Sequence, residues 1–283
     1  MIEPVLKDEA LLADIAAAES SNYLLHIWWL GQSGFLLKWA DRHVLLDPYL
    51  SDSLTTKYAD TDKPHVRMTA RAVDPMRLDF IDIVTSSHNH TDHLDADTLC
   101  PLREVNPGMR LVIPEANRAF VAERLTCPED VLTGVDAGES IKIAGITIDA
   151  VPAAHEEVSR DHAGRCHYLG YVLKLGPFRV YHSGDTVRYE GVEELLRPFA
   201  VDLALLPING ARPERRVAGN LDGGQAARLA KAIGARMVVP CHYEMFEFNT
   251  AAPDLFEATC DQIGQAYRTL RCGQRLTLPA AAI

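Results

Sequence analysis

The amino-acid sequence predicts an α/β protein built as a four-layer α/β/β/α sandwich. Two β-rich halves follow one another along the chain, and amphipathic segments of helical length follow the strands in each half. The chain has 283 residues, of which 47% are apolar, so it is long enough to bury a core between two sheets. We find no internal repeat, low-complexity tract or linker, and therefore predict a single domain over residues 1–283.

The first half is predicted to begin with a short amphipathic helix, at about residues 7–18. Strands are expected at 24–30, 34–39 and 43–46, and Ala40-Asp41 suits a hairpin turn between the last two. The stretch from about 49 to 74 is polar, so we predict a long loop there. It is either a lid over a site or a solvated loop.

The remaining elements follow from apolar runs, helical spacing and turn residues. Two hairpins are expected, one within 140–151 around Ala144-Gly145 and one within 168–182 around Gly176-Pro177. The other predicted strands are 80–86, 111–113, 202–206, 237–239 and 275–278, and the other predicted helices are 96–105, 116–125, 190–196, 225–233 and 253–270.

Charge and cysteine content exclude several classes of protein. Lys plus Arg number 28 and Asp plus Glu number 39, which gives a net charge of −11. An acidic chain disfavours long nucleic acid and anionic membranes as partners. No apolar run has the length of a membrane span, and residues 1–19 lack the pattern of a signal peptide. The six cysteines form no C-x-x-C pair, so we expect reduced thiols in a cytoplasmic protein.

The most informative segment runs from Ser87 to His93, directly after the predicted strand 80–86. Three imidazoles and one carboxylate occur within six residues, and these are the ligand types that suit Zn, Mn or Fe. A single histidine is more often a surface or core residue, but a run this dense favours a metal site. The candidate ligands in it are His88, His90, Asp92 and His93.

Three later residues each follow an apolar strand, namely His155, Asp185 and His242. Each alone could be structural, and Asp185 could be an ordinary turn residue. Together they complete a two-metal site. We expect His88, His90 and His155 on one ion, Asp92, His93 and His242 on the other, and Asp185 between them. Two divalent ions are predicted, Zn or Mn first, with Fe as a further option.

The order of these motifs resembles the metallo-β-lactamase superfamily. The resemblance runs from about Trp28 to Phe246 and implies an αββα fold with the metal site at one edge. The finer similarity is to the L-ascorbate-6-phosphate lactonase-like (UlaG-like) group, whose members act on varied compounds. The motifs that carry it are Trp28-Trp29-Leu30-Gly31, His88-Asn89-His90-Thr91-Asp92-His93-Leu94-Asp95, Tyr181-His182-Ser183-Gly184-Asp185 and Val239-Pro240-Cys241-His242.

Some residues are expected to support the ligands or to bind substrate. The resemblance implies that Asp47 accepts an imidazole N–H; the alternative is a turn at the end of a strand. His182 is expected as a supporting or core residue. In the basic segment 63–71, His65 and Arg67 would contact an anionic substrate, unless this loop is merely solvated. The further candidates for substrate contact are Asn209, Arg212 and Tyr243, the last of which could instead cover the core edge.

These residues predict a metal-dependent hydrolase. A hydroxide between the ions would attack a lactone, ester or related bond of a small anionic substrate. Asp92 and His93 are the expected catalytic residues, and Asp92 would orient the nucleophile and move its proton. The closest alternative is a phosphodiesterase acting on cyclic nucleotides or RNA. More distant alternatives are a di-iron oxidoreductase and a non-catalytic metal-binding protein. The resemblance is also compatible with a homo-oligomer.

Overall fold

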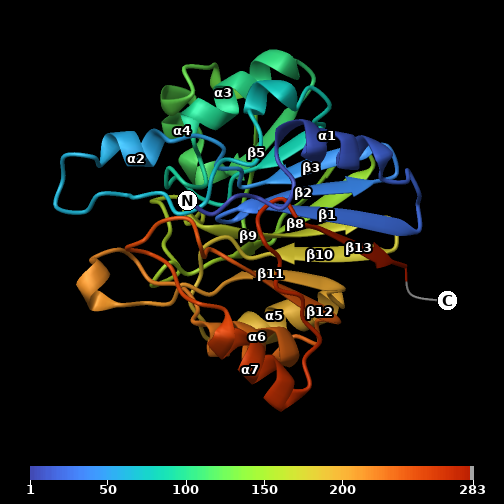
Figure 1. Ribbon diagram of the computed structural model, residues 1–283, viewed down its shortest axis with the longest axis vertical. Helices are drawn as coiled ribbons and strands as arrows, with labels where there is room; N and C mark the ends of the chain where they lie inside the picture. The colour runs from blue at the N-terminus through green and yellow to red at the C-terminus, as the bar shows by residue number, and fades with distance from the viewer. Residues whose placement is uncertain (281–283) are drawn as a thin grey trace.

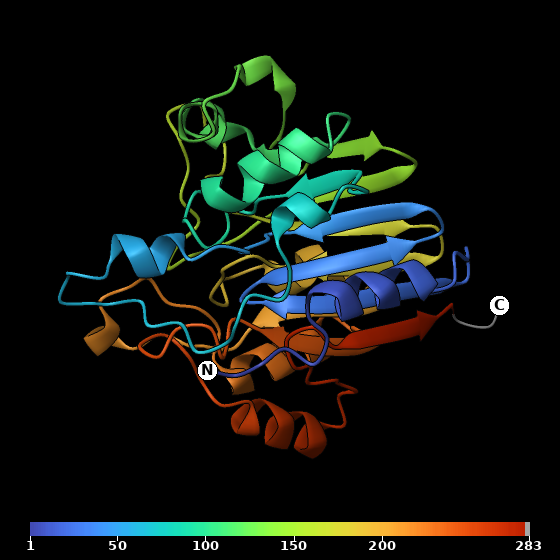
Figure 2. The same cartoon turned by 45° about the horizontal axis from the view of Figure 1, so that its top comes forward.

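Two β-sheets lie face to face, and helices cover the outer face of each in the computed structural model, which describes residues 1–280. Helices α1, α3 and α4 cover the first sheet, and α5, α6 and α7 cover the second (Figure 1). Figure 2 shows α1, in dark blue, lying over the first sheet with its axis roughly along the strands. The predicted four-layer α/β/β/α sandwich is therefore confirmed.

The first sheet has seven strands in the order β13-β1-β2-β3-β4-β5-β6. β1, β2 and β3 form an antiparallel meander, and β4, β5 and β6 continue it in parallel. The C-terminal strand β13 returns to this sheet and pairs antiparallel with β1. The strands are β1 (Leu24–Gly31), β2 (Gly34–Trp39), β3 (Arg42–Leu46), β4 (Ile83–Thr85), β5 (Arg110–Pro114), β6 (Leu132–Val135) and β13 (Arg275–Pro279).

The second sheet has six strands in the order β12-β11-β10-β9-β8-β7. Both predicted hairpins are present, as the antiparallel pairs β7–β8 and β9–β10. β10, β11 and β12 run parallel to one another. The strands are β7 (Ser140–Ile143), β8 (Ile146–Pro152), β9 (Leu169–Leu175), β10 (Phe178–His182), β11 (Leu203–Pro207) and β12 (Met237–Cys241).

The helices are short, and α6 begins with a side-chain cap. In α6, Asp222 accepts from the Gln225 backbone N–H, while the Gln225 side chain accepts from the Asp222 N–H, which is a capping box. The α-helices are α1 (Asp8–Ala17), α2 (Ser53–Lys57), α3 (Ala96–Val105), α4 (Arg118–Arg124), α5 (Val192–Leu196), α6 (Gly223–Ala232) and α7 (Asp254–Ile263). Single 3₁₀ turns occur at Pro75–Arg77, Glu115–Asn117, Glu129–Val131, Arg197–Phe199 and Pro213–Arg215.

Several predicted boundaries were wrong. The final helix ends at Ile263 rather than at 270, because Gly264 adopts a left-handed conformation and the chain beyond it runs beside β12. The strand predicted at 80–86 is only Ile83–Thr85. The short strand β6 was missed. The loop 49–74 contains α2, which buries Leu54, so it is not wholly irregular.

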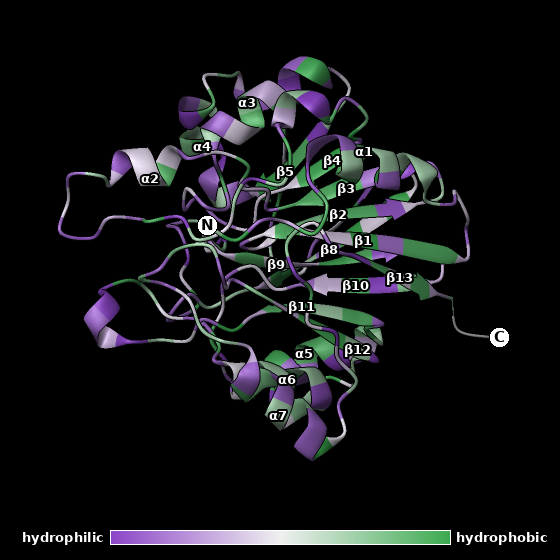
Figure 3. Ribbon diagram, viewed as in Figure 1, coloured by the Kyte–Doolittle hydropathy of each residue, from purple (hydrophilic) through white to green (hydrophobic). Residues whose placement is uncertain are grey.

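The apolar core lies between the sheets and under the helices, and the strands are correspondingly hydrophobic (Figure 3). The segment around α2 projects from the body, next to the loop that contains Pro213–Arg215 (Figure 1). No helix within residues 1–280 is long and apolar enough to cross a bilayer. The loops that leave β3, β4, β8, β10 and β12 gather at one edge of the sandwich, where they place the residues described next.

Candidate metal centre

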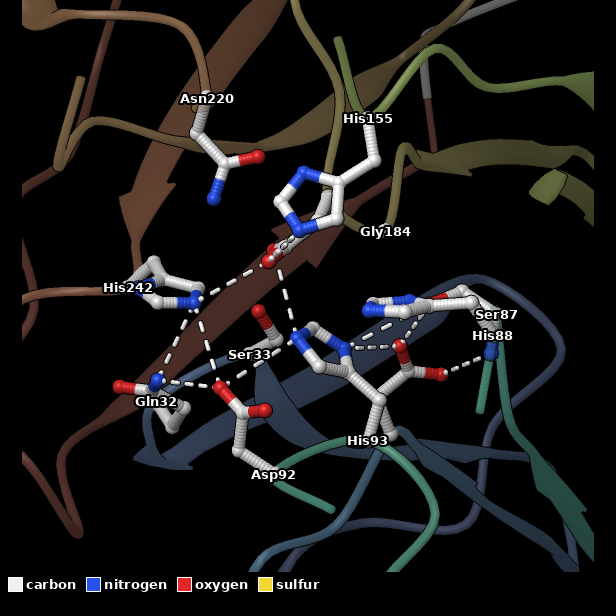
Figure 4. Close-up of polar contacts among 12 residues, drawn as sticks. Gln32, Ser33, Ser87, His88, Asp92, His93, His155, Gly184, Asn220 and His242 are labelled. Carbon is white, nitrogen blue, oxygen red and sulfur yellow. Dashed lines mark hydrogen bonds and ion pairs between the residues drawn. The ribbon is translucent and has the colours of Figure 1, made fainter. Parts of the chain in front are cut away.

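The predicted ligands converge from four loops at this edge. His88, His90, Asp92 and His93 follow β4, His155 follows β8, Asp185 follows β10 and His242 follows β12. Figure 4 shows His88, His93, His155 and His242 around a common centre, with Asp92 below it. Among the described residues, three sets of three have ligand atoms within 4.8 Å of one another, and two of them are His88, His90 and His155, and Asp92, His93 and His242. These are the two sets expected from the sequence.

Hydrogen bonds hold the Nδ1 side of three of these rings. His93 Nδ1 lies 2.7 Å from Asp47 Oδ2, and His155 Nδ1 lies 2.9 Å from the Gly219 carbonyl oxygen. His88 Nδ1 lies 3.0 Å from Ser87 Oγ. An Nδ1–H that donates to an oxygen leaves the Nε2 lone pair free for a metal ion. The three rings are thus oriented as metal ligands usually are.

Asp47 supports this arrangement rather than joining it. Its Oδ1 accepts the Ser87 backbone N–H at 2.9 Å, and its Oδ2 accepts the Ser87 hydroxyl as well as His93 Nδ1–H. Asp47, His88 and His93 also have ligand atoms within 4.8 Å. The Thr85 hydroxyl also donates to Oδ1, at 3.4 Å. Because the Asp47 carboxylate is already engaged by four donors, we assign it to holding His93 in place.

The spacing of the ligand atoms fits a bound ion. Four atoms placed tetrahedrally at about 2.0–2.2 Å from an ion lie about 3.3–3.6 Å apart. His242 Nε2 is 3.4 Å from Asp92 Oδ2 and 3.3 Å from Asp185 Oδ2. His93 Nε2 is 3.6 Å from Asp92 Oδ2 and 3.3 Å from Asp185 Oδ1. Asp185 therefore reaches both histidines, one with each carboxylate oxygen.

Several buried atoms at the centre have no hydrogen-bond partner within the described part of the chain. They include His88 Nε2, His93 Nε2 and Asp185 Oδ1. Burying such atoms without a partner is costly, so their convergence calls for a ligand. Imidazole nitrogens and carboxylate oxygens together are the donor set of divalent metal sites. The clusters are therefore consistent with a metal site.

The charge of the centre also favours a cation. Burial lowers the pKa of His88 well below its usual value, and neighbouring histidines lower it further, so this ring is neutral. Burial opposes ionisation of Asp185, yet His242 and His93 hold its pKa well below the usual range. Burial opposes protonation of His93 and His242, yet Asp185 and Asp92 raise the pKa of His93 well above its usual value and that of His242 to about 9. Without a metal these two rings are therefore protonated, and a divalent ion would take the place of their protons beside the carboxylates.

Gly184 allows the second sheet to approach the histidine motif. Its φ is +58°, and a Cβ there would lie 2.5 Å from both Cβ and Oγ of Ser87. A side chain at this position would push Ser87 away from Asp47 and displace the turn that carries Asp185. Glycine is therefore required at position 184 by close packing as well as by its left-handed conformation.

A cavity of about 340 Å³ opens over the centre. Its floor is formed by five of the predicted ligands, namely His90, Asp92, His155, Asp185 and His242. The walls come from the α2 region, α4 and the loops around 217 and 246, and consist of Leu54, Lys57, Tyr58, His65, Asn89, Thr91, Arg124, Val217, Ala218, Phe246, Phe248 and Asn249.

Comparison with known proteins places this fold and this centre in a family. The family model described as "Beta-lactamase superfamily domain" matches residues 42–243, which is most of the chain. The chain belongs to the β-lactamase superfamily. A UPF0173 metal-dependent hydrolase of Saccharolobus solfataricus is 26% identical over 255 residues, which cover 88% of this chain and 98% of that protein.

Solved structures of the superfamily fold align over most of the chain. A metallo hydrolase from the archaeon Ignicoccus hospitalis has a TM-score of 0.65 and 22% identity, covering 90% of this chain and 98% of the other. A metallo-beta-lactamase fold protein from Bacillus subtilis has a TM-score of 0.61 and 17% identity, covering 90% and 99%. A diiron beta-hydroxylase from Streptomyces venezuelae has a TM-score of 0.67 and 17% identity, covering 91% and 54%. The fold of this chain is thus the metallo-β-lactamase fold.

Of the predicted substrate contacts, the structure places only His65 in the lining of the cavity over the centre. The Arg67 guanidinium is bonded to Asp52, to the backbone oxygens of Ser51 and Thr69 and to Met245, away from the cavity. Tyr243 is buried against Trp29, and its hydroxyl donates to the Leu270 carbonyl. Asn209 is buried and donates to Asn249, while Arg212 is exposed and outside the lining.

His182 lies beside the centre rather than in it. Its Nε2 donates to the Ser33 carbonyl oxygen at 3.0 Å, and its ring packs edge-on against Phe35. The interaction ties the end of β10 to the turn between β1 and β2. His182 is therefore a buried residue that fixes the backbone of both sheets near the centre.

Three residues at the site were missed by the sequence analysis. Gln32 contacts Asp92 and His242, and Lys57 and Arg124 supply the cavity wall with positive charge. Gln32 stands between Gly31 and Ser33, directly after the motif Trp28-Trp29-Leu30-Gly31, and this adjacency was the available signal. For Lys57 and Arg124 we find no such signal, since neither adjoins a motif.

Proposed function

We propose that this chain is a metal-dependent hydrolase that cleaves a lactone, ester or related bond of a small anionic substrate, using two divalent ions. Membership of the superfamily and similarity to metal-dependent hydrolases support the general class. The observation that carries the proposal is the convergence of unpartnered buried nitrogens and carboxylates on the floor of a cavity.

The proposed ligand sets follow the two clusters. One ion would be held by His88, His90 and His155, and the other by Asp92, His93 and His242, with Asp185 between them. Zn or Mn suits this donor set best, and Fe also fits it. When bound, such a pair activates water and polarises a carbonyl or phosphoryl oxygen.

The protein's own residues would orient the reacting water and receive its proton. Asp92 lines the cavity, and the contacts that it makes within the described residues run through Oδ2. Its Oδ1 is therefore available as a hydrogen-bond acceptor, and we assign to it the orientation and deprotonation of the attacking water. Asp47 holds His93, which in turn contacts Asp92 and Asp185.

The cavity suggests how a small substrate would bind. The walls present two cations, Lys57 and Arg124, which suit a carboxylate or phosphate group. Another part of the wall is aromatic, where Tyr58, Phe246 and Phe248 pack around His65. Burial lowers the pKa of His65, so its ring is neutral and would accept a hydrogen bond rather than pair with an anion. We therefore expect a substrate with an anionic group and an apolar or planar part.

A substrate panel with matched variants tests this proposal. Sugar lactones, aryl esters, thioesters and phosphodiesters are assayed with the wild-type protein, His90→Ala, Asp92→Ala and the exposed control His162→Ala. We expect hydrolysis of a lactone or ester, a loss of at least about 100-fold in both site variants and no change in His162→Ala. Preferential hydrolysis of phosphodiesters would instead support the phosphodiesterase alternative. Equal rates in wild type and site variants would overturn the assignment of the site.

A further inference from the structure

Gln32 places a side-chain amide against two of the proposed ligands. It lies in the two-residue turn between β1 and β2, and it is fully buried. Its Nε2 is 2.7 Å from Asp92 Oδ2 and 3.1 Å from His242 Nε2. Its Oε1 is buried without a hydrogen-bond partner among residues 1–280. The interaction joins the first hairpin of the chain to the metal motif and to the loop after β12 (Figure 4).

The backbone holds Gln32 in this position. Its carbonyl oxygen accepts the His242 backbone N–H at 2.9 Å and Trp29 Nε1–H at 3.0 Å. Its φ is 50° and that of His242 is 63°, so two non-glycine residues in hydrogen-bond contact both adopt the left-handed conformation. Such conformations cost free energy and persist where the surrounding structure enforces them. The backbone of Gln32 is thus held by Trp29 and His242, and from this position its side chain reaches Asp92.

The Gln32 amide could be either a hydrogen-bond donor to Asp92 or a metal ligand, and the distances distinguish these two roles. The 2.7 Å between Gln32 Nε2 and Asp92 Oδ2 fits a charge-assisted N–H···O hydrogen bond. It is shorter than the separation of about 3.3–3.6 Å expected for two ligand atoms around one tetrahedral ion. With the amide reversed, Oε1 would face a carboxylate oxygen at the same short distance, which is repulsive. The amide is therefore a donor to Asp92 and not a ligand.

We propose that Gln32 is a positioning residue that orients Asp92 within one half of the centre, the half formed by Asp92, His93 and His242. The inference rests on the proposed function, because it requires that this half holds an ion. The hydrogen bond directs Asp92 Oδ2 toward His242 and His93. Because the carboxylate is already ordered, it loses less conformational entropy when it binds a metal. Among the described residues, no hydrogen bond joins Gln32 to the other half, formed by His88, His90 and His155, so we expect that half to be independent of Gln32.

The proposal predicts a selective loss of metal affinity. Metal-free protein is titrated with Co²⁺ and followed by absorbance and calorimetry. The proteins compared are wild type, Gln32→Met, Asp92→Ala and the double variant. Gln265→Met is the matched control, because Gln265 is a buried glutamine whose amide donates to the backbone oxygens of Ala235 and Ala266. Circular dichroism of the metal-free proteins checks that each variant folds.

We expect two equivalents of Co²⁺ in the wild type. Gln32→Met should lower the affinity for one equivalent about 10- to 100-fold and leave the affinity for the other unchanged. In the Asp92→Ala background the same substitution should change affinity by less than about twofold, because Gln32 acts through Asp92. The intensity of the Co²⁺ absorption at saturation should be the same in wild type and Gln32→Met. The control should match the wild type.

Three results would overturn the inference. Unchanged affinity of both equivalents in Gln32→Met would show that the hydrogen bond has no effect on binding. An equally large loss in the Asp92→Ala background would show that Gln32 does not act through Asp92. A changed absorption intensity at saturation would mean that the amide is itself a ligand. If the wild type binds no Co²⁺, the proposed function fails instead, so the two failures are distinguishable.

Discussion

At the scale of single residues, the centre depends on which ring nitrogen faces inward. Asp47 and the Gly219 carbonyl oxygen bind Nδ1 of His93 and His155, and this leaves Nε2 of each ring toward the carboxylates. The candidate ligands, which the structure brings together, could be proposed from sequence because their residue types and spacing carry the chemistry. Gln32, Lys57 and Arg124 could not, because their contacts with the centre or its cavity depend on how loops far apart in sequence pack together.

Gly184 provides a prediction at this scale. Gly184→Ala places a Cβ against Ser87 and also forces a left-handed conformation on alanine, whereas Gly138→Ala has the same backbone problem with open space around the Cβ. We expect Gly138→Ala to cost about 1 kcal/mol and Gly184→Ala to cost clearly more, about 2–4 kcal/mol. Urea unfolding of both variants measures the difference. Equal losses would mean that the approach of Gly184 to Ser87 is not tight.

At the scale of elements, the strands were predicted more accurately than the loops and helix ends. Apolar runs bounded by turn residues gave β2, β7, β8 and β10 nearly to the residue. The long loop was less predictable, because α2 is stabilised by contacts outside itself. Leu54 packs with Tyr49 and Phe246, and the Leu54 N–H donates to the Tyr49 hydroxyl. The same segment is tied to the loop around Arg216 by Lys63, which donates to the Arg216 carbonyl, and by the Arg216–Asp62 ion pair.

Helix α2 brings Lys57 to the cavity, which leads to a kinetic prediction. Lys57→Met should raise KM for an anionic substrate about tenfold, with little change in kcat, because a charged hydrogen bond to the substrate is lost. The exposed Lys142, on β7, provides the control variant. The measurement is steady-state kinetics at two salt concentrations, with the difference shrinking at high salt. An unchanged KM at low salt would remove Lys57 from substrate binding.

Strand β3 carries a histidine that makes stability depend on pH. Burial, assisted by nearby Lys38, lowers the pKa of His43 from 6.5 to about 4 in the folded protein. The unfolded chain therefore takes up this proton first as the pH falls. The contribution of His43 to the free energy of unfolding is constant above pH 7 and declines between about pH 6.5 and 4.

The variant His43→Gln tests this dependence against the exposed control His162→Gln. Chelator is present throughout. As the pH falls from 7 to 4.5, the unfolding midpoint of the wild type should fall relative to that of His43→Gln. The corresponding difference for His162→Gln should show a smaller change. A difference for His43→Gln that is constant across this range would contradict the assignment.

At the scale of the whole molecule, the centre would reconcile the acidic composition with the small anionic substrate that we propose. The net charge is −11, but two divalent ions would add about +4 at the centre, and Lys57 and Arg124 lie in the cavity wall. The fold class followed from the order of strands and helices, and the position of the site at one edge was implied by the resemblance to the superfamily. The return of β13 to pair with β1 could not be predicted, because its five residues are compatible with either sheet.

The centre should also stabilise the fold as a whole. Removing the ions with a chelator should lower the unfolding free energy by roughly 3 kcal/mol, and Tm by roughly 6–12 °C, since an ion at 100 times its Kd contributes about 2.7 kcal/mol. The double variant His90→Ala/Asp92→Ala should show little further change on chelation. Calorimetry with and without chelator measures both. A Tm that does not respond in the wild type would contradict a resident metal.

The most direct test of the central claim is the position of the ions themselves. Crystals grown with Zn²⁺ or Mn²⁺ and measured for anomalous scattering should show two peaks about 3.5–4 Å apart. One peak should lie within about 2.2 Å of Nε2 of His88, His90 and His155, and the other equally close to Asp92, His93 and His242. A single peak at Asp47, His88 and His93, or no peak at this edge of the sandwich, would contradict the account.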